Sequence, residues 1–170
     1  PVMAMELLRK TGAMHYVIPE LEETYSMTQN EYHFGTVWEH TMSVLAGIKD
    51  DDLILRLSAL LHDIGKIRVR TEEDGKIHFL KHELKSGEMI DELLRPLKFS
   101  NEIIKEVTFL VRNHMICKTW GYECENMKDK KLRRLHYECK TEERFRNLMT
   151  IIDADNKAHA ADKCMPKQVE

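Results

Sequence analysis

Residues that interrupt helices are scarce in this sequence. Seven glycines and four prolines occur among its 170 residues, about half of the ~12% that these two types contribute to average proteins. Hydrophobic residues make up 42% of the chain and charged residues 32%, a balance that excludes a disordered tail. Since the length is close to the ~150 residues typical of one domain, we expect a single, mainly helical unit.

Long apolar runs and a secretory signal are also lacking. The longest apolar runs cover about five residues, as at 44–48, whereas a membrane-spanning helix needs ~18 to 20. The N-terminal residues show no basic region followed by an apolar stretch, so no secretory signal is predicted. We therefore expect a cytoplasmic protein without a membrane partner. The chain starts at Pro1 rather than at a methionine, as expected of a piece of a longer protein.

Neither a disulfide framework nor an excess of positive charge is evident. The four cysteines form no Cys-x-x-Cys pair and crowd the C-terminal third, at Cys117, Cys124, Cys139 and Cys164. A disulfide framework would be spread more evenly, so we expect four reduced thiols, as in cytosolic proteins. The net charge of −3 gives no overall positive field that would attract nucleic acid.

Most of the chain carries the three- and four-residue apolar period of amphipathic helices. Capping and terminating residues suggest the bounds: Ser100 precedes one helix, Arg95-Pro96 follows another, and Gly65 is a candidate C-cap. The expected helices cover residues 2–10, 19–27, 36–49, 51–64, 82–94, 100–114, 127–138 and 142–158.

The period changes to two in one short region, residues 67–80. Apolar and polar residues alternate over 67–70 and 76–79, on either side of Asp74-Gly75, a pair that favours a tight turn. We expect a small hairpin there, or an irregular loop of similar shape. The predicted fold class is therefore all-α: one bundle over residues 1–170, in which helices within 1–35 lead into a core at 36–160.

Several histidines and aspartates fall on the expected inward faces or at the ends of different helices. They are His40, His62, Asp63, His82, His114 and Asp155. A single inward histidine is ordinary, but an unpaired buried carboxylate costs several kcal/mol. A shared divalent cation would compensate for that cost. Mixed histidine and carboxylate ligands suit Mn, Ni, Fe, Co, Mg or Zn rather than a structural thiolate zinc site.

The order of these residues resembles the HD phosphohydrolase superfamily: His40, then the adjacent His62-Asp63, then Asp155. The similarity extends, over about residues 5–160, to the HD domain behind the catalytic head of bacterial tRNA nucleotidyltransferases and related poly(A) polymerases. The matching stretches are Leu7-Leu8-Arg9-Lys10-Thr11-Gly12, Ile18-Pro19-Glu20-Leu21, Val37-Trp38-Glu39-His40-Thr41, Ala59-Leu60-Leu61-His62-Asp63-Ile64-Gly65-Lys66, Lys81-His82-Glu83 and Arg112-Asn113-His114. Nothing here resembles the Gly-rich head with paired aspartates, so nucleotide addition is not predicted.

This resemblance implies a compact HD-domain helical bundle with one or two divalent ions. By the family's pattern, His40, His62, Asp63 and Asp155 would bind the first ion, with Asp153 as the alternative to Asp155. The remaining two histidines, His82 and His114, would bind a second ion that Asp63 bridges. The Ala154-Asp155 pair matches the family and favours Asp155.

The implied chemistry is hydrolysis of a phosphate ester by metal-activated water. Asp63 and Lys66 are the catalytic candidates, since Lys66 could stabilise negative charge on the phosphoryl group. Further candidates for substrate binding, beside Lys66 itself, are Arg68, Arg70 and Arg112. The substrate would be a nucleotide, a cyclic nucleotide or an RNA-terminal phosphate ester.

Two other functions stay open at this point. The chain could be a non-catalytic tail module that binds tRNA or another RNA, or a regulatory domain that senses nucleotides. Nine basic and six acidic residues between Lys118 and Arg146 favour RNA binding, and Trp120, Tyr122 and Tyr137 among them could stack on bases.

Overall fold

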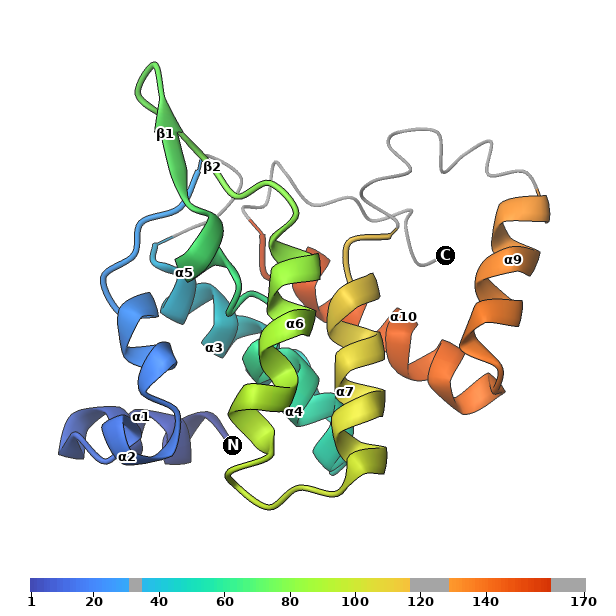
Figure 1. Cartoon of the computed structure of the whole chain (residues 1–170), viewed down its shortest axis with the longest axis horizontal. Helices are drawn as coiled ribbons and strands as arrows, with labels where there is room; N and C mark the ends of the chain where they lie inside the picture. Colours follow the sequence, from blue (N-terminus) through green and yellow to red (C-terminus); the bar gives the residue numbers. More distant parts are fainter. Residues whose placement is uncertain (31–34, 117–128, 160–170) are drawn as a thin grey trace.

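The computed structural model describes residues 1–30, 35–116 and 129–159, and it is built almost entirely of helices (Figure 1). One small antiparallel hairpin projects from an end of the bundle. The predicted all-α fold is therefore confirmed. No helix within these described ranges is long and apolar enough to cross a membrane.

The N-terminal residues form short helices that pack on the side of the bundle. They are α1 (Val2–Thr11), α2 (Met14–Val17) and the 3-10 helix η1 (Pro19–Thr24). Gly12 ends α1 in the left-handed conformation, at a φ of 73°. The helix expected at 19–27 is present but shorter than predicted. It is a 3-10 helix, whose three-residue period places Leu21 and Thr24 on the buried side.

Two helices with strong N-terminal caps form the centre of the bundle, α3 (Val37–Gly47) and α4 (Leu53–Leu61). Thr36 and Glu39 form a capping box at the start of α3, which satisfies otherwise unpaired amides. Asp52 caps α4 by accepting a hydrogen bond from the Leu55 amide at 2.9 Å. Helix α4 packs against α3 and against two later helices, α7 (Asn101–Asn113) and α10 (Glu142–Lys157), so it is buried on most sides.

The segment after α4 differs from the prediction. Helix α4 ends at Leu61 rather than Ile64, a turn covers residues 62–65, and α5 (Lys66–Val69) replaces the first predicted strand. Gly65 is not a left-handed cap, because its φ is −66°. Its lack of a side chain is required instead by a close approach to the next long helix, where an added Cβ would lie 2.4 Å from the Ser86 nitrogen.

The hairpin is present, although shorter than expected. Strands β1 (Thr71–Glu73) and β2 (Lys76–His78) pair in antiparallel register, with Thr71 opposite His78. Asp74 and Gly75 both have positive φ values, 50° and 72°, as a tight two-residue hairpin turn requires.

The later helices begin and end close to the predicted positions. They are α6 (His82–Leu94), α7 (Asn101–Asn113), α9 (Asp129–Cys139) and α10 (Glu142–Lys157). Ser100 caps α7 as predicted, by accepting from the Ile103 amide at 3.3 Å. Helices α6 and α7 lie side by side along their length (Figure 1).

A second, smaller hydrophobic cluster joins α7, α9 and α10. Its buried members are Leu110, Leu135, Cys139, Leu148 and Ile152. The Cys139 thiol is free, and burial raises its pKa. The other three cysteines, Cys117, Cys124 and Cys164, lie outside the described residues.

Candidate metal centre

Six side chains from five parts of the chain meet in the interior of the bundle. Helix α3 supplies His40, the turn after α4 supplies His62 and Asp63, and α10 supplies Asp155. The first residue of α6 is His82, and the residue that follows α7 is His114. All six are buried, with exposed fractions of 7% or less.

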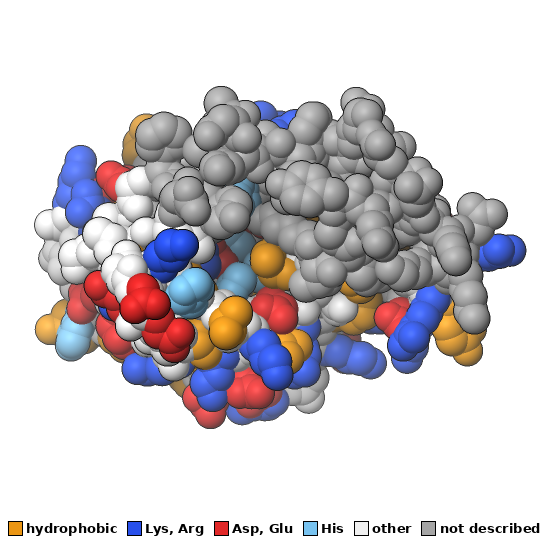
Figure 2. All heavy atoms as spheres, turned by 90° about the horizontal axis from the view of Figure 1, so that it is seen from above, with side chains coloured by type: hydrophobic (Ala, Val, Ile, Leu, Met, Phe, Trp, Pro, Cys, Tyr) orange, Lys and Arg blue, Asp and Glu red, His pale blue; other side chains and the backbone are white. Residues whose placement is uncertain are grey.

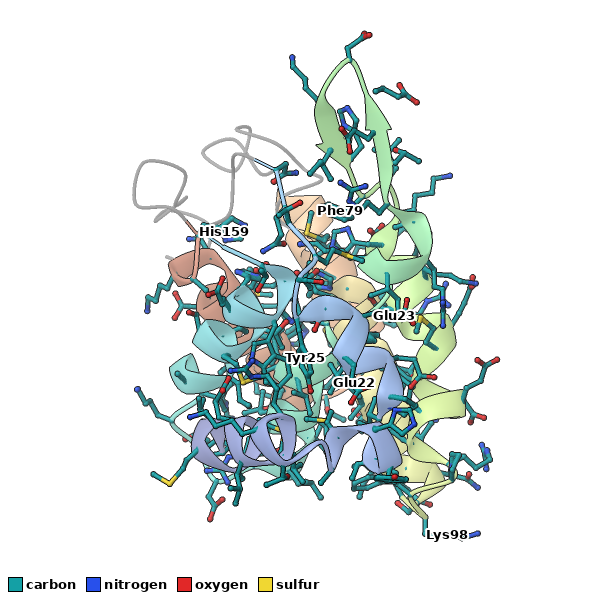
Figure 3. All side chains as sticks on the ribbon, turned by 90° about the vertical axis from the view of Figure 1, so that its left-hand side faces the viewer. Glu22, Glu23, Tyr25, Phe79, Lys98 and His159 are labelled. Atoms are coloured by element: carbon teal, nitrogen blue, oxygen red, sulfur yellow. The ribbon has the colours of Figure 1, made fainter. Side chains whose placement is uncertain are left out.

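The cluster lies toward the end of the bundle that carries the hairpin. Figure 3 shows Phe79 and His159 at that end and Lys98 at the opposite end. The carbonyl of Phe79 accepts a hydrogen bond from His82, and the ring of His159 packs edge-on against His40. Seen from this end, histidine side chains gather near the middle of the face in Figure 2.

One half of the cluster surrounds a single oxygen of Asp63. Asp63 Oδ2 lies 3.2 Å from His62 Nε2 and 3.6 Å from His40 Nε2. The two histidine Nε2 atoms are 3.3 Å apart, and His40 Nε2 is 3.1 Å from Asp155 Oδ1. Four residues therefore direct nitrogen or oxygen atoms into one small volume.

The other half surrounds the second oxygen of the same carboxylate. Asp63 Oδ1 lies 3.1 Å from His82 Nε2 and 3.8 Å from His114 Nε2. The ring centres of His82 and His114 are 5.3 Å apart. Asp63 therefore lies between two groups of possible metal ligands, and each of its carboxylate oxygens faces one group.

Backbone carbonyls fix how three of the histidines present their nitrogens. The Nδ1 atoms of His62, His82 and His114 donate to the carbonyls of residues 59, 79 and 111 at 2.9, 2.9 and 2.7 Å. Because a carbonyl only accepts, Nδ1 carries a proton, and in the neutral ring the Nε2 lone pair is directed into the cluster. Lone pairs and carboxylate oxygens that face one another repel, so this donor set fits a divalent cation.

The electrostatics keep most of these groups in the state that a metal requires. Burial, reinforced by the neighbouring His62 and His82, lowers the pKa of His114 to about 3. Burial also lowers the pKa of His40. Burial opposes the charged form of Asp63, but His62 and Lys66 outweigh it and hold the pKa of this carboxyl well below its usual range.

The pKa of His62 is shifted in the opposite direction to the pKa values of His40 and His114. Burial disfavours its protonated form, yet the carboxylates of Asp63 and Asp155 outweigh burial and raise its pKa. In the protein without an ion, the two carboxylates therefore favour the protonated form of His62. A bound cation would replace that proton, because a metal-binding imidazole is neutral.

Lys66 belongs to the same site. Its side chain is 1% exposed, and Nζ lies 2.7 Å from Asp63 Oδ2 and 2.7 Å from Gln29 Oε1. The ammonium also lies over the ring of Phe79, 5.2 Å from its centre. Burial of a lysine is tolerated when its charge is paired, and here Asp63 supplies the pairing charge.

The three arginines expected to bind substrate are not brought into the cluster. Arg68 pairs with Glu23 at 3.5 Å and Arg70 with Glu72 at 3.0 Å, both in partly exposed positions. Arg112 is exposed, and its stem covers Gly87 in α6.

The two candidate aspartates of α10 point to different surroundings. Asp155 contacts His40, whereas Asp153 is more exposed and pairs with Lys157 at 2.6 Å. Neither Gln29 nor His159 was identified as a site residue from the sequence. His159 Nδ1 donates to the Asp155 carbonyl at 2.6 Å. No local signal identifies Gln29, because its partner Lys66 is 37 residues away.

An open pocket lies beside His40, with a volume of about 340 Å³. Among the described residues it is lined by Gly35, Glu39, Ser43 and Ala158 together with His40. These side chains are small or polar, so the pocket leaves room for a ligand group next to the first half of the cluster.

Only part of the basic stretch can be described. Trp120 and Tyr122 lie outside the described residues, while Tyr137 on α9 is 83% exposed. Arg144 is mostly buried and pairs with Glu106 through Nε and Oε2 at 2.7 Å. Arg134 pairs with Glu138 at 2.8 Å. Arg144 therefore stabilises the contact between α7 and α10 rather than a free basic surface.

A helical bundle with an inward His, His-Asp, Asp set is the architecture of an HD domain. The model of the HD domain family matches residues 30–159, and the chain belongs to this family. It is 33% identical over 115 residues to an A-adding tRNA nucleotidyltransferase of Deinococcus radiodurans, covering 64% of this chain and 26% of the relative.

Two further relatives show the same extent of similarity. A CC-adding tRNA nucleotidyltransferase of Thermus thermophilus is 33% identical over 117 residues, 65% of this chain and 27% of its own. A multifunctional CCA protein of Cupriavidus taiwanensis is 31% identical over 118 residues, 67% of this chain and 28% of its own. The chain thus spans little more than a quarter of the length of these relatives.

Proposed function

We propose that this chain is a metal-dependent phosphohydrolase that acts on a nucleotide, a cyclic nucleotide or an RNA-terminal phosphate ester. The observation that carries the proposal is the position of Asp63 between two groups of donor atoms, one group on each carboxylate oxygen. We further propose that residues 1–170 act as one domain in the cytoplasm, with the site carried by residues 36–160.

The donor atoms divide into two ligand sets that share Asp63. His40, His62 and Asp155 would complete the first set, and His82 and His114 the second. Nitrogen and oxygen ligands of this kind suit Mn, Ni, Fe, Co, Mg or Zn. When bound, such a cation lowers the pKa of water towards ~7 and offsets negative charge on phosphoryl oxygens.

The chain's own residues would bind and orient the ester. Lys66 holds a buried positive charge beside Asp63, where it can stabilise the negative charge that develops on the phosphoryl group. The pocket beside His40 offers room for the rest of the substrate. Arg68, Arg70 and Arg112 would reach a substrate only if it extended beyond the cluster.

A panel assay tests this function. Wild type, Asp63→Asn and Lys66→Met are incubated with Mn, Ni, Co or Mg and with 2′,3′-cyclic nucleotides, nucleoside monophosphates and a simple diester. We expect Asp63→Asn to abolish hydrolysis and Lys66→Met to slow it by about 10²-fold. Lys85→Met is the matched control, because Lys85 is a surface lysine paired with Glu88 and should keep full activity.

A second candidate function is binding of tRNA without catalysis. It is favoured by the names of two relatives, which are tRNA nucleotidyltransferases, and by the exposed Tyr137 on α9. Wild-type protein that is inactive on the whole panel with every metal, yet binds tRNA in a gel-shift assay, would replace the hydrolase proposal with this one.

A further inference from the structure

The buried ammonium of Lys66 has a second oxygen partner besides Asp63. Nζ donates to Gln29 Oε1 at 2.7 Å, the same distance as to Asp63 Oδ2. A lysine side chain has four flexible carbons, and one ion pair alone leaves its ammonium free to pivot. The contact with Gln29 therefore fixes where the charge lies.

The orientation of the Gln29 amide is itself determined by its partners. Its Nε2 donates to the Thr36 carbonyl at 3.1 Å, and its Oε1 accepts from Lys66. A carbonyl can only accept and an ammonium can only donate, so the flipped amide would lose both hydrogen bonds. Gln29 thus presents an acceptor, and never a donor, to Lys66.

Gln29 also connects Lys66 with the helix that carries His40. The Thr36 carbonyl accepts from Gln29 and, in the first turn of α3, from the His40 amide at 3.1 Å. The backbone nearby is paired as well, since the Val37 amide donates to the Met27 carbonyl at 2.9 Å. Two sides of the site, α3 and α5, are therefore joined through one amide side chain.

Gln29 is uncharged, and this determines the net charge around the Lys66 ammonium. Asp63 already offsets the charge of Lys66, and a second carboxylate would make the surroundings of the ammonium net negative and repel a phosphate. An amide oxygen accepts a hydrogen bond without adding charge. Among the described residues, Asp63 and Gln29 take two of the three donors of the ammonium.

We propose that Gln29 is a positioning residue for Lys66: its neutral amide holds the ammonium so that the remaining N–H is available to a phosphoryl oxygen of the substrate. The inference rests on the proposed phosphohydrolase function. It assigns a role to a residue outside the metal cluster and predicts that Gln29 acts only through Lys66.

A double-mutant cycle on the full chain tests this dependence. Inorganic phosphate is titrated by calorimetry into the Mn²⁺-loaded protein, and turnover of bis(p-nitrophenyl) phosphate is measured in parallel. The variants are Gln29→Leu, Lys66→Met, the double variant and Gln29→Glu. Thr28→Ala is the matched control, since it changes an exposed neighbour whose backbone pairing with Thr36 is kept.

We expect Gln29→Leu to weaken phosphate binding by about tenfold, the effect of a hydrogen bond to a charged group. In the Lys66→Met background the same change should have no further effect. Gln29→Glu should weaken phosphate binding without weakening Mn²⁺ binding. A merely structural role for Gln29 would not separate these two affinities. If Gln29→Leu fails to fold, Gln29→Glu still tests the inference through this separation of phosphate binding from Mn²⁺ binding.

The outcomes separate this inference from the proposed function. Phosphate binding that follows the expected cycle, in a protein that is inactive on the whole substrate panel with every metal, would disprove the hydrolase and support the role of Gln29. Equal effects of Gln29→Leu in both backgrounds, loss of Mn²⁺ binding with Gln29→Glu, or absence of phosphate binding by wild type would overturn the inference.

Discussion

Gly65 and Ser86 are in direct contact where the turn that carries Asp63 meets α6. The Gly65 amide donates to Ser86 Oγ at 2.8 Å, and both residues are buried. A Cβ on Gly65 would lie 2.4 Å from the Ser86 nitrogen and 2.6 Å from the His82 carbonyl oxygen. Since these are backbone atoms, the helix would have to move, and His82 would move with it.

We therefore expect Gly65→Ala to lower the free energy of unfolding by about 2 to 3 kcal/mol and to weaken metal binding. Gly87→Ala is the control on the same helix. Its added Cβ would lie 2.1 Å from Arg112 Cγ, a side-chain contact that a different χ1 rotamer of Arg112 relieves without moving the backbone, and alanine is favoured over glycine within a helix by about 1 kcal/mol. Urea unfolding of both variants measures the difference, and equal effects would contradict the backbone contact.

This contact also explains where sequence reasoning failed locally. A glycine after an apolar helix suggests a C-cap, and alternation at 67–70 suggests a strand. Gly65 instead contacts Ser86, which is 21 residues away, and the chain continues into α5. By contrast, the end of α6 and the turn at Asp74-Gly75 depend on nearby residues alone, so their patterns predicted them well.

The residues of the site also divide into those placed by local spacing and those placed by long-range contacts. The inward position of Asp155 follows from its spacing of three residues after Ile152, and the structure brings it to His40. A basic residue such as Lys66 shows no local sign of being buried. Its position depends on Asp63 and on the distant Gln29, and a helical period contains no information about such long-range contacts.

A second prediction concerns the ion pair between Asp63 and Lys66 in metal-free protein. Asp63→Asn should destabilise the fold by about 3 kcal/mol, because it leaves the buried ammonium without its carboxylate. Lys66→Met should destabilise the fold by a similar amount, because it leaves the buried Asp63 carboxylate without its ammonium. The double variant should lose less than the sum of the two. Thermal or urea unfolding in a chelator measures the cycle, and strict additivity would show that the pair is not coupled.

A third prediction follows from the pKa of about 3 at His114, which burial causes. An unfolded histidine titrates near pH ~6.5, so the unfolded state binds more protons than the folded state between these two values. His114 therefore makes metal-free protein less stable as the pH falls below ~6.5, by up to about 1.4 kcal/mol per pH unit.

His114→Gln removes this titration and leaves the other histidines in place. When the pH is lowered from 6.5 to 5, the free energy of unfolding should fall by about 2 kcal/mol less for the variant than for wild type. Urea unfolding in a chelator at both pH values gives the comparison. A difference between the two proteins that does not change with pH would mean that His114 is not held neutral.

The last prediction concerns the number of ions. Asp63 Oδ2 faces His40 and His62, whereas Oδ1 faces His82 and His114. If each oxygen binds its own cation, wild type should bind two Mn²⁺ ions at saturation, and His40→Ala or His82→Ala should each bind one tightly. Asp63→Asn should lose both, since the two sets share this carboxylate.

Calorimetry and metal analysis after dialysis would count the ions, with His136→Ala as the control. His136 is exposed and pairs with Glu142 at 2.9 Å, so its loss should leave the count at two. An ion that binds only the folded protein stabilises it by mass action. Each of the two ions should therefore raise the melting temperature separately. Wild type that saturates at one ion, with His82→Ala unchanged in affinity and melting temperature, would show that His82 and His114 form no second site.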